Sequence, residues 1–240
     1  MKETVKEVKY SPQEVDVKQM FNDIAPRYDF LNHFLSANMD KRWRKKTISM
    51  LKPYHPKRIL DIATGTADLA IEAMRLEPEM ITGVDITEEM LRLAAIKIQK
   101  KNLSDTIILK AARSEELPFG DASFDAVMVA FGVRNFYDLE KGLKEMHRVL
   151  KNNGVVTILE FTVPTAFPIK QIYTFYFRKI LPVMGKIVSK SKTAYTYLPE
   201  TVFSFPQGKA FTALLEKTGF TNTRFRRLSM GICSIYIAEK

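Results

Sequence analysis

The chain has 240 residues, a formal net charge of +10 and a single cysteine, Cys233. Its length suits one large domain, or one domain with an insertion. A lone cysteine excludes an internal disulfide framework and suits a reducing compartment. Cys233 lies in a predicted strand, so we expect it to be a buried, unreactive thiol. The sequence has no apolar segment of membrane-spanning length and no signal-peptide layout. The excess of positive charge predicts an anionic partner: nucleic acid, a membrane surface or an acidic substrate.

The N-terminal part of the chain predicts a helical segment ahead of the main domain. Apolar side chains recur at helical spacing within residues 12–24, and a basic helix is expected over residues 40–51. Between them, residues 25–38 mix aromatic, polar and basic side chains with little periodicity. Such a segment is typical of a lid over a pocket, and a helix packed on the domain is the alternative. We therefore expect a helical lid segment over residues 1–50 and the main domain over residues 51–240.

Strand and helix patterns alternate through the main domain. In chain order they predict a strand at 59–62, a helix at 67–76, a strand at 80–84, a helix at 87–101, strands at 107–111 and 124–130, a helix at 138–150 and a strand at 154–161. After an interruption they predict a helix at 207–219 and strands at 223–228 and 232–238. This alternation favours an α/β fold with a mostly parallel sheet, helices on both faces and a closing antiparallel hairpin.

The interruption is basic and aromatic. From Phe161 to Pro199 the chain has no Asp or Glu, but it carries six lysines and arginines among many aromatic side chains. We interpret residues 162–204 as a helical insertion in the main domain.

The most informative stretch begins at the end of the first predicted strand and continues through the turn after it, as Asp61-Ile-Ala-Thr-Gly-Thr-Ala-Asp68. A strand, a small-residue turn and a helix N-terminus let the backbone approach a ligand and leave N–H groups for it. The loop lacks both the G-x-G-x-x-G fingerprint and the Gly-Lys-Ser/Thr of a P-loop. Its acids suit an amino-acid-like zwitterion, with Asp68 on the ammonium group and the loop amides on the carboxylate. A Rossmann-like turn without a ligand is the alternative.

A second acid, Asp85, ends the next predicted strand 20 residues after Gly65. An acid at this place can bind a ribose diol. The two segments together resemble motifs I and II of the class I S-adenosylmethionine-dependent methyltransferases. In that fold the segment after the third strand flanks the adenine, which makes Arg113 and Ser114 candidates for this contact. A solvated loop is the alternative for both.

A third candidate segment, Phe131-Gly-Val-Arg-Asn135, follows the fourth predicted strand. Gly132 permits close approach, and an Arg-Asn pair beside a pocket can hold a phenolate or an ordered water. Alternatively, Arg134 pairs with a surface acid. No cluster of residues shows the spacing of a metal site.

Four separated segments together resemble one family, the menaquinone/ubiquinone biosynthesis C-methyltransferases. They are Tyr28-Asp-Phe-Leu-Asn-His-Phe-Leu-Ser36 with Trp43, the segment from Asp61 to Asp68, the segment from Phe131 to Asn135, and Arg148-Val-Leu-Lys151 with Gly154 and Glu160. The family often has His at Asp40, Pro-Gly at Asn152-Asn153 and Ser at Ala130 and Thr162. These departures concern single contacts and leave the class intact.

The resemblance implies a Rossmann-like, seven-stranded class I methyltransferase fold with S-adenosyl-L-methionine as cofactor. It implies carbon methylation of a reduced polyprenylated quinol, either demethylmenaquinol or the equivalent benzoquinol of the ubiquinone pathway. Arg134 and Asn135 are then expected to stabilise the phenolate or remove its proton. We expect cofactor contacts at Asp61, Thr64, Gly65, Thr66, Asp68, Asp85, Arg113 and Ser114, and substrate or lid contacts at Tyr28, Asn32, His33, Tyr173 and Phe177.

A prenylated substrate would also explain why the insertion is basic and aromatic. Because the prenyl tail lies in a membrane, we expect peripheral contact with an anionic membrane surface from the cytoplasmic side. The absence of a mitochondrial presequence favours a bacterial enzyme, and a homodimer is left open. An RNA or DNA methyltransferase would share the fold and the charge. The chain lacks an Asn/Asp-Pro-Pro-Tyr motif and an appended RNA module, so no nucleic-acid partner is expected. A small-molecule methyltransferase and a binding module without catalysis stay as alternatives.

Overall fold

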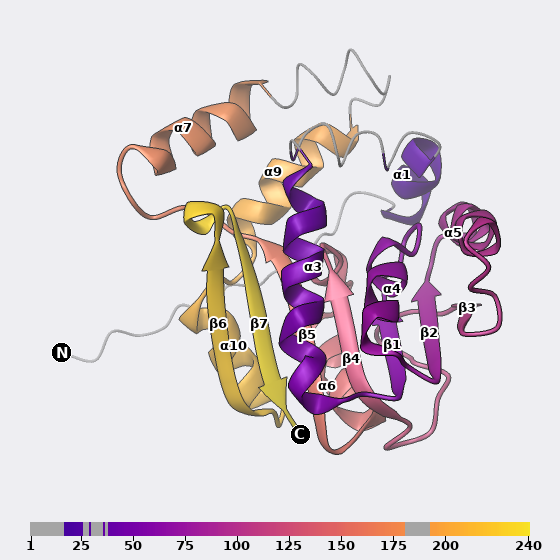
Figure 1. Ribbon diagram of the computed structural model, residues 1–240. Helices are drawn as coiled ribbons and strands as arrows, with labels where there is room; N and C mark the ends of the chain where they lie inside the picture. Colours follow the sequence, from indigo (N-terminus) through magenta and orange to yellow (C-terminus); the bar gives the residue numbers. More distant parts are fainter. Residues whose placement is uncertain (1–16, 26–28, 30–35, 37, 181–192) are drawn as a thin grey trace.

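The computed structural model describes residues 17–25, 29, 36, 38–180 and 193–240. The described chain folds around a seven-stranded sheet in the order β3-β2-β1-β4-β5-β7-β6 (Figure 1). The strands are β1 Arg58–Ile62, β2 Met80–Asp85, β3 Ile107–Ala111, β4 Phe124–Ala130, β5 Leu150–Phe161, β6 Thr221–Leu228 and β7 Cys233–Glu239. Strands β1 to β5 are parallel, and β7 runs antiparallel to both β5 and β6. The predicted mostly parallel sheet with an antiparallel closing hairpin is confirmed.

The fifth strand begins earlier than predicted. Leu150 pairs with Phe124, and the next pair along the strands is Val155 with Ala126, so residues 151–154 lie opposite the single residue Asp125. This irregular stretch is polar and has no alternation of apolar side chains, which is why the sequence placed the strand start at 154. The preceding helix accordingly ends at Val149.

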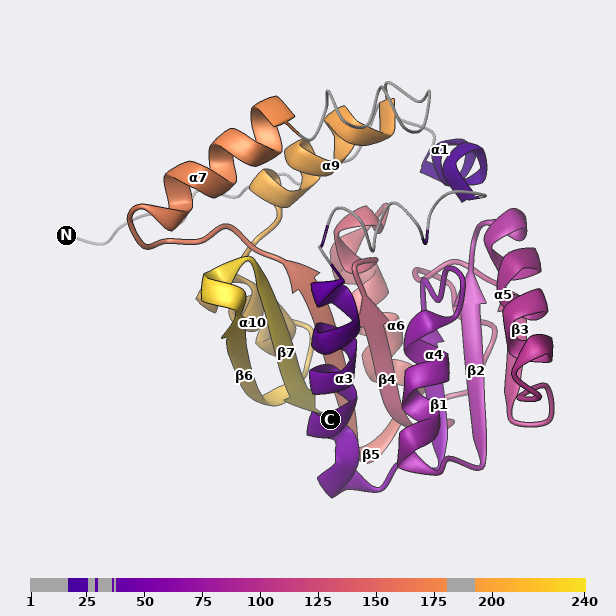
Figure 2. The ribbon, with the colours of Figure 1, turned by 45° about the horizontal axis from the view of Figure 1, so that its top comes forward.

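Helices cover both faces of the sheet (Figure 2). On one face, α3 (Met39–Leu51), α4 (Asp68–Ala73) and α5 (Glu88–Lys100) pack on side chains such as Ile59, Ile81 and Met128. On the other face, α6 (Leu139–Val149) and α10 (Lys209–Lys217) pack on Leu60, Val127 and Tyr236. Short helical turns are η2 Lys52–Tyr54, η3 Met74–Leu76, η4 Val133–Asn135 and η6 Ser229–Gly231.

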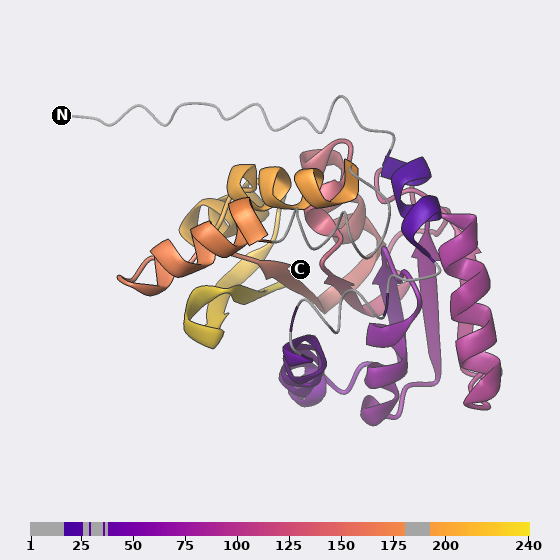
Figure 3. The ribbon, with the colours of Figure 1, turned by 90° about the horizontal axis from the view of Figure 1, so that it is seen from above.

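A roof of helices lies along the sheet edge at which the parallel strands end and extends over the β6–β7 hairpin, as seen from above in Figure 3. We use this name for α1 (Val17–Ile24), α7 (Ile169–Phe175) with its continuation η5 (Tyr176–Ile180), and α9 (Thr193–Ser204). A separate apolar cluster holds them together, built from Met20, Ile24, Tyr173, Phe177, Tyr197 and Val202. The roof therefore combines part of the N-terminal segment with the insertion, over the sheet edge where ligands are expected.

The predicted division at residue 50 cuts through the packing. Helix α3 contacts β5, and its Trp43, Ile48 and Leu51 are buried against the sheet.

Cys233 is a buried free thiol, as expected. Within the ranges that the structure covers, no helix has both the length and the apolar character needed to cross a membrane.

Candidate active site

The predicted ligand loop forms a tight turn between β1 and α4. Thr64 N donates to Val84 O at 2.9 Å, and Thr64 Oγ1 donates to Asp61 Oδ2 at 2.6 Å. Gly65 has a φ of 56°, in the left-handed region that glycine adopts without strain. The Thr64 and Asp61 side chains thus support the turn from within the protein, while Gly65 lines an adjacent cavity.

Asp85 ends β2 directly beside this turn. Its Oδ2 accepts from Gly65 N and its Oδ1 accepts from Thr87 N, each at 2.9 Å. Both bonds fix the carboxylate beside the cavity that Asp85 lines. Burial raises the pKa of Asp85, and it raises the pKa of Asp61 to about 7, with the Asp85 charge adding to the shift. A cationic ligand nearby would stabilise both carboxylates in their ionised form.

A cavity of about 600 Å³ opens over these residues. This volume lies in the usual range of small-molecule and cofactor sites. Five of the predicted site residues line it, namely Gly65, Asp85, Arg113, Ser114 and Asn135. The cavity is also lined by residues that the sequence analysis did not single out, including Val17, Lys18 and Phe21 of α1, Met90 of α5, and Tyr137. The N-terminal helix thus closes one side of a cavity whose floor is the sheet edge.

Gly132 brings the end of β4 against the β1 loop. A Cβ atom at Gly132 would lie 2.5 Å from Ala63 Cβ, closer than any side chain permits. Glycine is therefore required here for the contact between the two loops, and both residues line the cavity.

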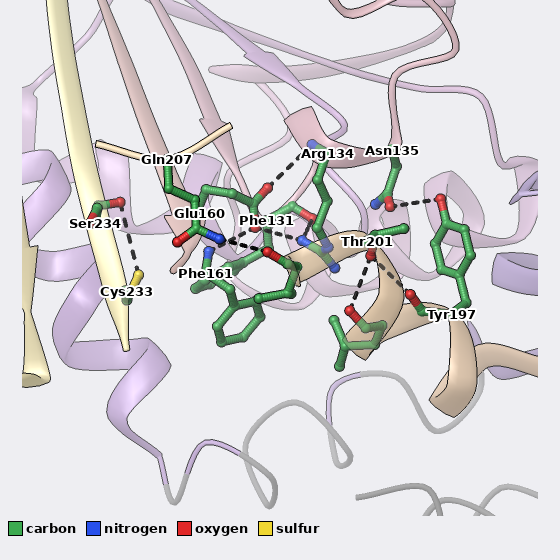
Figure 4. A network of polar contacts seen from close by, with 12 residues as sticks. Phe131, Arg134, Asn135, Glu160, Phe161, Tyr197, Thr201, Gln207, Cys233 and Ser234 are labelled. Atoms are coloured by element: carbon green, nitrogen blue, oxygen red, sulfur yellow. Dashed lines mark hydrogen bonds and ion pairs between the residues drawn. The ribbon is translucent and has the colours of Figure 1, made fainter. Parts of the chain in front are cut away.

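Arg134 is fixed by a buried acid on the neighbouring strand (Figure 4). Its Nη1 donates to Glu160 Oε1 at 2.7 Å and to Phe131 O at 2.6 Å, while Phe161 N donates to Glu160 Oε1 at 2.8 Å. Burial raises the pKa of Glu160, and the adjacent guanidinium opposes that rise. The acid that pairs with Arg134 is buried, unlike the surface acid of the alternative interpretation, so the pair anchors η4 to the sheet.

Asn135, the next residue, faces the cavity and is held from the roof. Tyr197 Oη donates to Asn135 Oδ1 at 3.1 Å (Figure 4). Tyr197 lies on α9 and is buried. The two predicted catalytic residues are thus adjacent in the chain, but Arg134 is held by Glu160 in the sheet and Asn135 by Tyr197 in the roof.

Thr66 and Asp68 meet a lysine that the sequence analysis did not single out. Lys97 Nζ lies 2.7 Å from Asp68 Oδ1, 3.0 Å from Thr66 Oγ1 and 2.6 Å from Asp29 Oδ2. Arg44 Nη1 lies 3.4 Å from the other oxygen of Asp68. Asp68 therefore already faces two cations. Its contact with the ammonium group of a cofactor stays a prediction.

Tyr173 and Phe177 lie in the roof. Their rings stack with centroids 4.2 Å apart, and Phe177 meets Phe161, whose ring stacks on Phe131 at 4.5 Å. Because Phe131 lines the cavity, these rings form an apolar path from the cavity into the roof. Contact of Tyr173 and Phe177 with a substrate stays a prediction. The other candidates of this group, Tyr28, Asn32 and His33, lie outside the described residues.

The structure adds partners that local sequence patterns did not reveal. Glu160 belongs to the fourth segment of the family resemblance, and its local signal is an acid directly after residues 155–159, which are apolar except for Thr157. Lys97 lies on the partly exposed side of α5, and Tyr197 is one of many aromatic residues in the insertion, so neither had a distinguishing signal. In the part of the chain that the structure describes, no group of His, Cys, Asp or Glu side chains could hold a metal ion.

Comparison with solved structures supports the fold. A SAM-dependent methyltransferase from Thermotoga maritima, described as a possible histamine N-methyltransferase, superposes with a TM-score of 0.64 at 19% identity. The similarity covers 92% of this chain and 99% of that chain. At this identity the likeness concerns the fold alone, and it confirms the predicted class I methyltransferase architecture.

Sequence relatives define the family. A protein of Bacteroides fragilis named demethylmenaquinone methyltransferase is 48% identical over 225 residues, which cover 93% of this chain and 92% of the relative. A Geotalea daltonii protein named ubiquinone/menaquinone biosynthesis C-methyltransferase UbiE is 44% identical, over 93% of this chain and 96% of the relative. The sequence model of the ubiE/COQ5 methyltransferase family matches residues 5–240. The predicted resemblance is confirmed, and the chain belongs to the ubiE/COQ5 methyltransferase family.

Proposed function

We propose that this chain is an S-adenosylmethionine-dependent C-methyltransferase that converts demethylmenaquinol to menaquinol. The observation that carries the proposal is a single cavity that joins Gly65 and Asp85 to Asn135, in a chain 48% identical to a protein named demethylmenaquinone methyltransferase. The equivalent benzoquinol of the ubiquinone pathway is the second candidate, because other relatives carry names that include both pathways.

The residues around the cavity fit S-adenosylmethionine. The oriented Asp85 carboxylate offers acceptors to the ribose hydroxyls, and the buried acids Asp61 and Asp85 favour a ligand with positive charge. Arg113 and Ser114 line the same cavity, and we expect the adenine to bind beside them. Bound there, S-adenosylmethionine supplies a methyl group that its sulfonium centre activates for transfer.

The chain's own residues act on the acceptor. The quinol must be reduced, because a phenol that loses its proton raises the electron density of the neighbouring ring carbon. That carbon accepts the methyl group and then releases its own proton, which restores the aromatic ring. The Asn135 side chain, which lines the cavity, offers its N–H groups to the phenolate, and the positive charge of Arg134 beside it on η4 adds to the stabilisation. The cavity aligns the reactants and excludes water. The rings of Phe131, Phe161 and Phe177 offer an apolar surface to the acceptor.

A methyl-transfer assay tests the function. The enzyme is incubated with methyl-labelled S-adenosylmethionine and either a reduced short-chain demethylnaphthoquinol or the corresponding reduced benzoquinol. We expect label in the naphthoquinol ring and no transfer when the same quinone is left oxidised. Absence of transfer to both reduced quinols would contradict the proposal, and transfer to the benzoquinol alone would favour the second candidate.

We further propose that the roof contacts an anionic membrane surface, where a prenylated quinol resides. Around α7, Phe167, Ile172 and Phe175 are 81%, 64% and 61% exposed. Exposed basic residues accompany them, namely Lys170, Arg178 and Lys179. Aromatic and aliphatic side chains with lysine and arginine suit the headgroup region of anionic lipid, and the absence of acids from 161 to 199 avoids repulsion.

Vesicle co-sedimentation tests this contact. The double variant Lys170→Glu/Lys179→Glu should lose binding to vesicles that contain phosphatidylglycerol, while wild type binds them better than neutral vesicles. The matched control is Lys100→Glu/Lys101→Glu, which changes the net charge equally at exposed lysines around the end of α5. Equal loss in both variants, or wild-type binding that ignores lipid charge, would contradict the proposal. The proposal would also be contradicted if light scattering showed that the wild type is a stable dimer and that the Lys170→Glu/Lys179→Glu variant is a monomer.

A further inference from the structure

Arg134 and Asn135 are neighbours on η4, but different parts of the molecule hold them. Arg134 is bonded to Glu160 and to the Phe131 carbonyl, both of which belong to the sheet and its end. Asn135 Oδ1 accepts its 3.1 Å hydrogen bond from Tyr197 on α9 (Figure 4). The sheet therefore positions the guanidinium group, and the insertion positions the carboxamide.

The direction of this hydrogen bond decides what Asn135 presents to the cavity. The Tyr197 hydroxyl lies against the amide oxygen of Asn135, which can only accept, so the hydroxyl is the donor. Burial raises the pKa of Tyr197, which keeps this proton in place. A carboxamide carries an acceptor oxygen on one side and a donor NH₂ group on the other. When Tyr197 holds the oxygen, the NH₂ group is the part that Asn135 offers elsewhere. Asn135 lines the cavity, so the cavity receives a donor.

Methylation of a quinol requires a hydrogen-bond donor at this position in the cavity. A phenolate is stabilised by N–H groups that are aimed at it before the reaction begins, and a carboxamide oxygen turned towards it would repel it. We propose that Tyr197 is a positioning residue, which holds the Asn135 carboxamide so that its NH₂ group faces the phenolic oxygen of the methyl acceptor. This inference rests on the proposed function, in which the acceptor is a reduced quinol.

Tyr197 belongs to the insertion, so the insertion takes part in positioning Asn135. Tyr197 belongs to the apolar cluster of the roof, where it packs with Met20 of α1 and with Tyr173 and Phe177 of the insertion. The packing of the roof thus fixes the Tyr197 hydroxyl above η4. The insertion therefore completes the acceptor site, in addition to its proposed contact with lipid.

The variant Tyr197→Phe tests the proposal, because it removes the hydroxyl and keeps the ring. We expect kcat on a reduced demethylnaphthoquinol to fall roughly tenfold, the effect of one lost hydrogen bond near a developing charge. The acid limb of the kcat–pH profile should move to higher pH, because the bound phenol then ionises less readily. Cofactor affinity and Tm should stay near their wild-type values. The control is Tyr54→Phe, which removes a hydroxyl bonded to Glu239 at 2.5 Å, away from the cavity.

A double-mutant cycle separates positioning from a structural effect. In an Asn135→Ala background, Tyr197→Phe should have less than a twofold effect on kcat, because the carboxamide it positions is gone. If Tyr197→Phe folds poorly, Asn135→Asp tests the same point, since it places two acceptors where a donor is needed and should lower kcat at least as far as Asn135→Ala. An unchanged kcat and pH profile in Tyr197→Phe, or an equal effect in both backgrounds, overturns the inference. Absence of turnover in the wild type overturns the proposed function itself.

Discussion

At the scale of single residues, the site depends on charged groups buried away from water. Glu160 is fully buried and Arg134 is 6% exposed, and each would be costly to bury without the other. Asn135 lines the cavity, whereas Arg134, its neighbour on η4, does not. In the proposed function this arrangement separates two tasks: we expect the cofactor to contact the β1 and β2 loops and the acceptor to contact η4.

Replacing Arg134 tests this separation. Arg134→Ala should lower turnover about a hundredfold or more, because the positive charge beside the phenolate site is lost. Cofactor affinity measured by calorimetry should change little. The control is Arg148→Ala, whose guanidinium pairs with Glu145 at 2.7 Å and lies outside the cavity. Unchanged turnover per folded molecule of Arg134→Ala would remove this residue from the mechanism.

Asp61 makes the stability of the ligand-free protein depend on pH. Its pKa is raised to about 7, so between about pH 4 and about pH 7 the folded state holds a proton that the unfolded state has released. The protein should therefore lose stability as pH rises through this window, and the loss is complete above it. Asp61→Asn cannot ionise and should show a flatter profile in urea unfolding at pH 5 and pH 8. Parallel profiles for both proteins would contradict this assignment.

At the scale of elements, the β1–α4 loop and the β4–η4 turn form one unit. Ala63 and Gly132 meet so closely that a single methyl group at 132 has no room. The loop that lines the cofactor side is thus held by the turn that carries Arg134 and Asn135.

A compensating pair of substitutions tests this contact. Gly132→Ala should destabilise the protein by about 1–3 kcal/mol through overpacking and should weaken cofactor binding. Adding Ala63→Gly removes the opposing Cβ and should restore much of the stability and of the cofactor affinity, as measured by Tm and calorimetry. Ala63 has a φ of 52°, which glycine tolerates well. A double variant as impaired as Gly132→Ala would show that the contact with Ala63 is not the cause.

The elements were predictable where apolar periodicity is strong. Strands β3 and β4 have the predicted bounds, and the closing hairpin has the predicted pairing. The start of β5 was missed because residues 151–154 bulge opposite Asp125, which depends on pairing between strands. The contacts in the site likewise depend on residues that are far apart in the sequence. Motif spacing placed Gly65, Asp85 and Asn135 around one cavity, but the partners Glu160 and Tyr197 are 26 and 62 positions away from the residues they hold.

At the scale of the whole molecule, the sheet edge and the roof enclose the site together. The sheet contributes the acids, the turn and Arg134, while the roof contributes α1 at the cavity wall and Tyr197 above Asn135. Part of the N-terminal segment and the insertion therefore meet in one cluster over the cavity. In the proposed function, the parallel sheet supplies the cofactor side of this cavity, and the added helices shape the acceptor side.

A crystal structure with bound S-adenosylhomocysteine would test the central claim most directly. We expect the ribose hydroxyls to bind the Asp85 carboxylate, and the sulfur atom to face the η4 side of the cavity near Asn135. A nucleoside bound elsewhere, or bound here with its sulfur turned away from η4, would contradict the account.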